Sequence, residues 1–143
     1  MKSKVLKWIV AGILLIGIAG SYIAYTQWNK EHADATDVEG LKVSAQELLK
    51  AYQSNEQEAN AKYVGKAVEV SGEIAEITGD TTPKIIVAVP DEIMEGIVVS
   101  IDKRYASDVS NLKTGDKVVF KGFCSGYLQM SGVIVNDAVL VKQ

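Results

Sequence analysis

The chain has little of what disulfides and metal sites are made from. Its 143 residues include one cysteine, Cys124, and one histidine, His32. A single cysteine cannot form an internal disulfide, and these two residues cannot supply the four Cys or His ligands of a structural zinc site. We therefore expect no internal disulfide, no metal site and no cofactor.

Arginine is also scarce, since Arg104 is the only one in the chain. Lys2, Lys4 and Lys7 precede a long apolar run, which leaves 12 Lys and Arg against 18 Asp and Glu from Thr26 onward, a net charge of −6. Nucleic-acid binding draws most of its affinity from cations placed on phosphates. An acidic domain lacks that basic footprint, so nucleic acid is an unfavoured partner.

The long apolar run predicts a membrane anchor. Trp8–Tyr25 contains 18 residues without a charge, and from Val5 only Lys7 interrupts it. At a rise of 1.5 Å per residue the run nearly spans a hydrocarbon core of about 30 Å. Residues 5–25 are therefore expected to lie in the membrane. The alternative is a signal peptide cleaved near Gly17-Ile18-Ala19, but the apolar run continues past that point.

The lysines before the run predict the orientation of this anchor. Positive residues stay on the cytoplasmic side, which sends the rest of the chain across the membrane. We expect a single-pass protein of the inner (cytoplasmic) membrane with a cytoplasmic N-terminus and a periplasmic or extracellular C-terminal domain. The expected organisation is an anchor over residues 1–25, a polar tether over 26–42 and a folded domain over 43–143.

An amphipathic helix is expected to begin this domain. Ser44 and Glu47 have the spacing of a capping box, in which each side chain satisfies the other residue's backbone N–H. Apolar residues then recur at helical spacing and predict a face that packs on the core. This face consists of Leu48, Leu49, Tyr52, Ala59 and Tyr63.

The segment Lys66–Ile77 predicts the strand around which the domain is built. Val68, Val70 and Ile74 alternate with polar residues, as in a half-buried strand. The alternation then slips by one residue beside Gly72, which indicates a bulge or bend. A long first strand that bends can belong to two sheets at once.

Four further strands follow, with a short helical segment at Tyr105–Leu112 between the second and third of them. The strands are expected at Lys84–Val89, Gly96–Ile101, Asp116–Cys124 and Val133–Val141. The fold class is therefore mainly β: a five-stranded Greek-key barrel of the OB-fold type, with a preceding amphipathic helix and an N-terminal transmembrane helix. A five-stranded open sandwich is the structural alternative.

Two stretches carry a resemblance to a known family. NEQEANAKYVGKAVEVSGEIAEI and LKTGDKVVFKGFCSGYL, in this order and spacing, resemble the bacterial tRNA_anti-like (tRNA-anticodon-like) OB-fold family over roughly residues 43–141. The resemblance implies a small envelope or secreted protein with an OB-fold. The family's name records a similarity of fold, and tRNA binding is not carried over.

The chain departs from this family at two positions. Members often have cysteines where this chain has Ser100 and Asp137. If those cysteines pair in other members, this chain lacks the bond. Asp137 then lies either at the barrel rim, or buried and hydrogen-bonded.

The OB-fold predicts where a ligand would bind. Ligands of this fold use the face of the second and third strands and the loops between strands 1–2 and 4–5, here Thr78–Pro83 and Ser125–Gly132. Tyr127 could stack on a base or sugar ring, or could cap the barrel end. The candidate ligand-binding residues on this face and in these loops are Lys84, Lys103, Arg104, Tyr105, Tyr127 and Met130.

No catalytic motif accompanies these residues. Cys124 falls on the apolar face of its strand and is expected to be buried. Acidic pairs such as Asp91/Glu92 lack the partners that acid–base catalysis needs. The sequence therefore predicts a non-catalytic, membrane-tethered binding module of the bacterial envelope whose partner is a protein, peptide or glycan.

Two other functions remain open. The fold by analogy suggests a nucleic-acid-binding OB-fold protein. The small-residue pairs Gly17/Ser21 and Gly20/Ala24 would suit a structural subunit that assembles through its transmembrane helix. The oligomeric state is not predicted.

Overall fold

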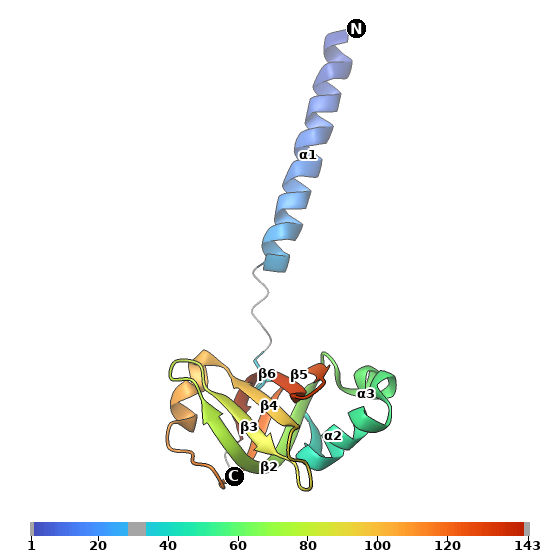
Figure 1. Ribbon diagram of the computed structural model, residues 1–143. Coiled ribbons are helices and arrows are strands. Elements are labelled where there is room, and N and C mark those ends of the chain that lie inside the picture. Colours follow the sequence, from blue (N-terminus) through green and yellow to red (C-terminus); the bar gives the residue numbers. More distant parts are fainter. Residues whose placement is uncertain (1, 29–33, 142–143) are drawn as a thin grey trace. The chain divides into compact units, whose positions relative to one another are not determined.

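The first unit of the structure is one long helix, α1 (Lys2–Trp28). The computed structural model describes residues 2–28 and 34–141, and the chain divides into the units Met1–Ala33 and Asp34–Gln143 (Figure 1). Within α1, the 23 residues Lys4–Thr26 are long and apolar enough to cross a membrane. This confirms an N-terminal helix of membrane-spanning length. Residues 29–33 of the expected tether, His32 among them, lie outside the described residues.

The second unit begins with two short helices, α2 (Ala45–Ser54) and α3 (Glu56–Tyr63). The capping box is confirmed: the Ser44 hydroxyl accepts from the Glu47 N–H, and the Glu47 carboxylate accepts from the Ser44 N–H, both at 3.1 Å. The expected continuous helix is interrupted at Asn55, whose backbone is extended and whose side chain caps α3 by accepting from the Glu58 N–H. The predicted apolar face is buried throughout: Leu48, Leu49, Tyr52, Ala59 and Tyr63.

Five strands of this unit close into a barrel (Figure 1). They are β2 (Ala67–Thr78), β3 (Lys84–Ala88), β4 (Gly96–Ile101), β5 (Lys117–Leu128) and β6 (Gly132–Leu140). β2 pairs antiparallel with β3, β3 with β4 and β5 with β6; β4 pairs parallel with β6, and β5 returns antiparallel to β2. The short 3-10 helix η1 (Lys103–Val109) lies between β4 and β5. The expected OB-type barrel is confirmed, and the open-sandwich alternative is wrong.

β2 bends where the sequence pattern slips. Its first half, Ala67–Glu73, pairs with β5, and its second half, Glu73–Thr78, pairs with β3. The register with β3 shifts between Ile74 and Glu76, which is a β-bulge. At Gly72 an added Cβ would overlap a methyl group of Val87, so a side chain at this bend would force its neighbours to move.

A sixth strand, β1 (Leu41–Ser44), was not expected. It runs parallel to β2, with Leu41 opposite Val68 and Ser44 opposite Ser71. A strand has two edges, and β5 occupies one edge of β2. β1 therefore takes the part of the other edge that β3 leaves open. Leu41 and Lys42, which the sequence pattern assigns to the polar tether, form the first half of this strand; four residues are too few to show an alternation.

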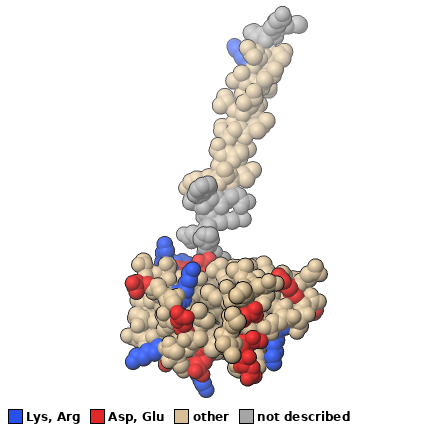
Figure 2. Space-filling view, viewed as in Figure 1, with Lys and Arg blue, Asp and Glu red and all other residues tan. Residues whose placement is uncertain are grey.

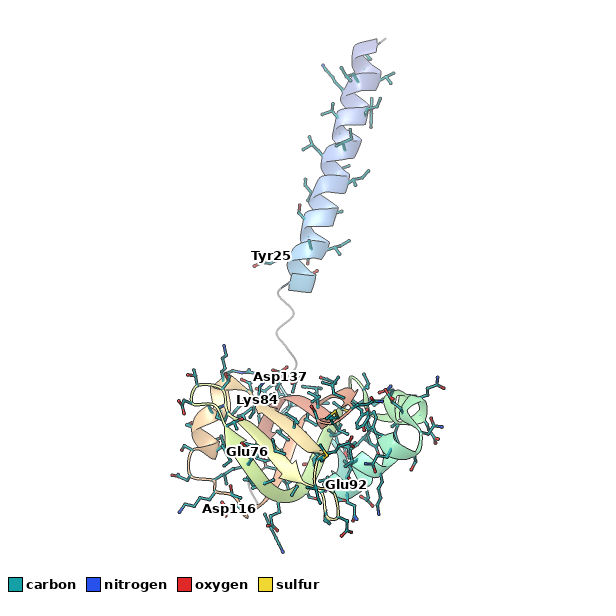
Figure 3. All side chains as sticks on the ribbon, viewed as in Figure 1. Tyr25, Glu76, Lys84, Glu92, Asp116 and Asp137 are labelled. Atoms are coloured by element: carbon teal, nitrogen blue, oxygen red, sulfur yellow. The ribbon has the colours of Figure 1, made fainter. Side chains whose placement is uncertain are left out.

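The end of β5 also differs from the expectation. The strand continues to Leu128, so the predicted loop Ser125–Gly132 is only a turn at residues 129–131. A register shift between Cys124 and Gly126 accommodates the glycine that suggested a loop. Asp137 lies in β6 with a φ of 49° and an exposed side chain, so it is not buried (Figure 3).

Cys124 is buried in the core, as predicted. Its Sγ lies 3.3 Å from the hydroxyl of Tyr52, and the pair joins α2 to β5. Burial, together with the Cys124 contact, raises the pKa of Tyr52. This phenol therefore stays neutral and serves as a packing and hydrogen-bonding group.

Candidate binding groove on the barrel

A groove of about 420 Å³ lies on the outer face of β2, β3 and β4. Its floor is formed by neighbouring residues on three adjacent strands: Glu76 of β2 pairs with Ile86 of β3, and Ile86 pairs with Val98 of β4. The loop between β3 and β4 and the turn between β5 and β6 form its rim. We call this the groove; its lining residues are Ala75, Glu76, Ile86, Ala88, Val89, Glu92, Ile93, Met94, Glu95, Gly96, Val98, Met130 and Ser131.

The floor is apolar because β3 and β4 carry apolar residues on both faces at their centres; Lys84 and Ser100, which pair at one end of these strands, are the polar residues of the outward face. Ile85, Val87 and Val99 point into the barrel and are buried. Alternate residues point outward, so Ile86 and Val98 are only half-buried. A strand with one face in water normally carries polar residues on that face. These two strands therefore present an apolar surface at the position where OB-folds bind their ligands.

The rim adds three apolar side chains that are largely exposed to solvent. Ile93 is 99% exposed, Met94 69% and Met130 72%. Met130 also has a φ of 68°, a left-handed conformation that costs a residue with a Cβ about 1–2 kcal/mol. Uncharged atoms cover much of the face that contains β3 and β4, with charged side chains around them (Figure 2). Exposed apolar side chains surrounded by charged ones are typical of an interaction surface rather than of a solvated strand.

Glu95 holds the two parts of the rim together. Its Oε1 accepts from the Tyr127 hydroxyl at 2.8 Å and from the Met130 N–H at 3.2 Å, and its Oε2 accepts from the Gln53 side chain at 3.3 Å. The bond from Tyr127 is the largest of the effects that lower the pKa of Glu95. Glu95 therefore stays ionised and fixes the loop that presents Ile93 and Met94.

Acid is expected to loosen this rim. Because the pKa of Glu95 is lowered in the folded state, its hydrogen bonds stabilise that state fully above the unfolded pKa of about 4.3. This stabilisation is lost as the pH falls through the lower folded pKa. An NMR titration of the Glu95 carboxyl carbon should show a midpoint below about 4.3, and Tyr127→Phe should raise it. A midpoint at or above that value in the wild type would contradict the network.

The structure brings two of the six sequence-predicted residues to the groove. Met130 lines it, and Tyr127 supports it through Glu95. One face of the Tyr127 ring stacks on Tyr52, with the centroids 5.9 Å apart. Lys84 lies on the same outward face, two residues from Ile86, but is not among the lining residues. Figure 3 shows Lys84 and Glu92 toward opposite ends of this face, with Glu76 between them.

The other three predicted residues lie on η1, and two of them contact the start of the unit. Arg104 forms ion pairs with Asp102 at 2.6 Å and with Asp34 at 3.2 Å. The Tyr105 hydroxyl donates to Asp34 at 2.8 Å, and the neighbouring Ala35 is buried. Lys103 is exposed at the beginning of η1. Arg104 and Tyr105 thus fasten the first described residues of the unit to the barrel.

Sequence reasoning missed the apolar half of the site. The sequence pattern assigns Ile86 and Val98 to strands and singles out neither Ile93 nor Met94, although two adjacent runs, KIIVAV and GIVVSI, are apolar at almost every position. A strand with one face in water should alternate, so the lack of alternation was the available signal. Gln53 could not be found this way, because its contact with Glu95 depends on how α2 packs.

The lining residues determine which interactions the groove can offer a ligand. The lining residues contain three carboxylates and no histidine, cysteine, lysine or arginine. Across residues 2–28 and 34–141, no three His, Cys, Asp or Glu side chains are grouped so that they could hold a metal ion. What the groove offers a ligand is apolar contact and negative charge.

Three solved structures are similar to this chain. A "putative nucleic acid-binding lipoprotein" from Klebsiella pneumoniae subsp. pneumoniae MGH 78578 is 18% identical, covers 79% of this chain and 100% of its own, and has a TM-score of 0.60. Two OBodies bound to hen egg-white lysozyme, AM3L09 and AM3L15, are each 16% identical; they cover 57% of this chain and 87% and 81% of their own, with TM-scores of 0.45 and 0.44. No curated protein matches the sequence.

The family match extends further along the chain than the resemblance noted from the two motifs. It covers residues 1–139 and so includes the apolar helix as well as the barrel. With the closed five-stranded barrel, this match establishes that the chain belongs to the tRNA_anti-like family.

Proposed function

We propose that this protein is a non-catalytic, membrane-tethered binding module of the bacterial envelope, and that it holds a protein or peptide partner in the groove. One observation carries the proposal. The middle of the outer face of β3 and β4 is apolar at Ile86 and Val98, and the rim of the groove exposes Ile93, Met94 and Met130 to solvent. Clustered apolar side chains that a soluble domain leaves exposed often mark a contact with another molecule.

The helix α1 supports the tether. Its apolar segment is long enough to cross a bilayer, and Lys2, Lys4 and Lys7 precede or begin it. Positive charge at this end favours a cytoplasmic N-terminus. The barrel then lies on the outer side of the cytoplasmic membrane, where an envelope partner would reach the groove.

The orientation can be tested with a single added thiol. Cys124 is buried, so a Lys84→Cys variant carries one accessible cysteine. A membrane-impermeant maleimide should label this variant in intact spheroplasts and leave the wild type nearly unlabelled. Labelling that requires permeabilisation would place the barrel in the cytoplasm and overturn this part of the proposal.

The partner can be tested by comparative affinity purification of the full-length protein from solubilised envelope. The double variant Ile93→Ser/Met94→Ser removes two exposed rim side chains. Val64→Ser, which changes an exposed apolar residue outside the groove, is the matched control. A heterologous envelope protein should co-purify with the wild type and with the control, and should be lost with the double variant. Equal recovery with all three proteins would contradict a role for the groove.

Nucleic-acid binding is the competing function, and it has a clear signature. The full-length protein in phosphatidylcholine nanodiscs is titrated with a single-stranded oligonucleotide at several salt concentrations. Affinity tighter than about 1 μM that falls steeply with salt would support nucleic-acid binding. The acidic groove predicts weak binding instead, because Glu76, Glu92 and Glu95 would repel phosphates.

A further inference from the structure

The groove has a chemistry that selects among possible peptides. Its floor and rim offer apolar contacts, from Ile86 and Val98 below and from Ile93, Met94 and Met130 above. None of its lining residues is aromatic. Bases and sugar rings are usually held by stacking on aromatic side chains, so this lining suits aliphatic side chains better.

The charged residues that line the groove are all of one sign. Glu76 enters from β2, and Glu92 and Glu95 enter from the loop between β3 and β4. The groove has no Lys or Arg among its lining residues, and the chain from Thr26 onward carries a net charge of −6. Complementarity therefore favours a partner with positive charge.

The rim is also held in place before a partner arrives. Glu95 joins the Ile93–Met94 loop to Tyr127, to Gln53 and to the backbone of Met130. Met130 keeps a left-handed backbone that asparagine or glycine would adopt more easily. A strained methionine with an exposed side chain is readily explained if that side chain is needed for contact.

We propose that the groove binds an extended peptide segment in which a short run of aliphatic residues is bracketed by lysine or arginine. The aliphatic side chains lie on Ile86 and Val98 and under Ile93, Met94 and Met130, and the cationic ends lie against Glu76 and Glu92. This inference rests on the proposed function, because it names the chemistry of the partner that the groove would hold.

Fluorescence anisotropy with defined peptides tests it. The full-length protein in phosphatidylcholine nanodiscs is titrated with labelled Lys-Lys-Leu-Val-Val-Leu-Lys-Lys, with its acidic counterpart Glu-Glu-Leu-Val-Val-Leu-Glu-Glu, and with the polar Lys-Lys-Ser-Gly-Gly-Ser-Lys-Lys. Empty nanodiscs control for binding to lipid. We expect the first peptide to bind about tenfold or more tightly than either of the others.

Variants locate the binding and separate contact from stability. Ile93→Ser/Met94→Ser should lower the affinity for the cationic aliphatic peptide about tenfold. Glu76→Gln/Glu92→Gln should also lower this affinity and should reduce its dependence on salt concentration. Met130→Asn should lower it while leaving the urea midpoint of the protein equal or higher, since asparagine tolerates the left-handed backbone. Val64→Ser should change neither quantity.

Several results would overturn the inference. These are equal binding of the three peptides, preference for the acidic one, binding unaffected by the rim variants, or self-association through the groove in sedimentation experiments. If the purification yields a groove-dependent envelope protein but the peptides do not discriminate, the proposed function stands and this inference fails. If the peptides discriminate but no envelope protein depends on the groove, the inference stands and the proposed function fails.

Discussion

Replacing Gly132 by alanine is expected to destabilise the barrel by about 2–5 kcal/mol. Gly132 begins β6 opposite Gly96, the first residue of β4, and an added Cβ would overlap the carbonyl oxygen of Gly96. Its φ of 100° is also unfavourable for any residue with a side chain. Because the parallel pair of β4 and β6 closes the barrel, the clash cannot be relieved without separating these strands.

Gly115→Ala is the matched control for this prediction. Gly115 has a similar φ of 92°, but no atom lies within 4 Å of where its Cβ would be. The Gly115→Ala variant should therefore lose only the stability that the left-handed backbone costs a residue with a Cβ, about 1–2 kcal/mol. Urea denaturation of the Asp34–Gln143 fragment measures both variants. Equal losses would show that the close contact between Gly132 and Gly96 contributes nothing to the barrel.

Gly72→Ala is expected to lower the free energy of unfolding by about 1–3 kcal/mol. The added methyl group would overlap Val87 and approach Ala45 at 3.3 Å, at the place where β2 bends and α2 packs. Ser71→Ala, at the exposed neighbouring position, should change stability by less than about 0.5 kcal/mol.

A double variant tests the cause of this loss. Val87→Ala removes the methyl groups with which the new Cβ collides, so the double variant Gly72→Ala/Val87→Ala should lose less stability than the sum of the two single changes. The same urea titration gives the coupling energy. Strict additivity would mean that the contact between Gly72 and Val87 does not explain the requirement for glycine.

The fold could be predicted because its main features are local in the sequence. The alternation of Val68, Val70 and Ile74, and its slip after Gly72, encode a strand and a bulge within a few residues. The Ser44–Glu47 capping box is equally local. β1 could not be predicted, because a four-residue strand exists only through its pairing with β2.

The site was predictable only in part, for a related reason. The expected OB face is where the groove lies, and Met130 lines it. Most of the predicted ligand-binding residues are cations or aromatic rings, because nucleic-acid-binding barrels use such residues. In the structure Arg104 pairs with Asp34 and Asp102, and Tyr127 packs on Tyr52 and bonds to Glu95. These are long-range contacts, and composition alone does not reveal them.

Asp34, the first described residue of the second unit, is held by Arg104 and Tyr105 of η1. Asp34 accepts hydrogen bonds from the Thr36 N–H and the Tyr105 hydroxyl, and these contacts, with the charge of Arg104, lower its pKa. The chain divides into its two units just before Asp34, so these contacts hold the beginning of the second unit to η1.

Photo-crosslinking from the groove rim in intact cells shows whether the groove holds an envelope partner. A photoreactive phenylalanine analogue is placed at Ile93, which is 99% exposed, and in a separate variant at Val64, which is 41% exposed and outside the groove. We expect the probe at residue 93 to capture one heterologous envelope protein and the probe at residue 64 not to capture it. Capture of that protein from both positions, or crosslinking at residue 93 only to a second copy of the chain or to nucleic acid, would contradict this expectation.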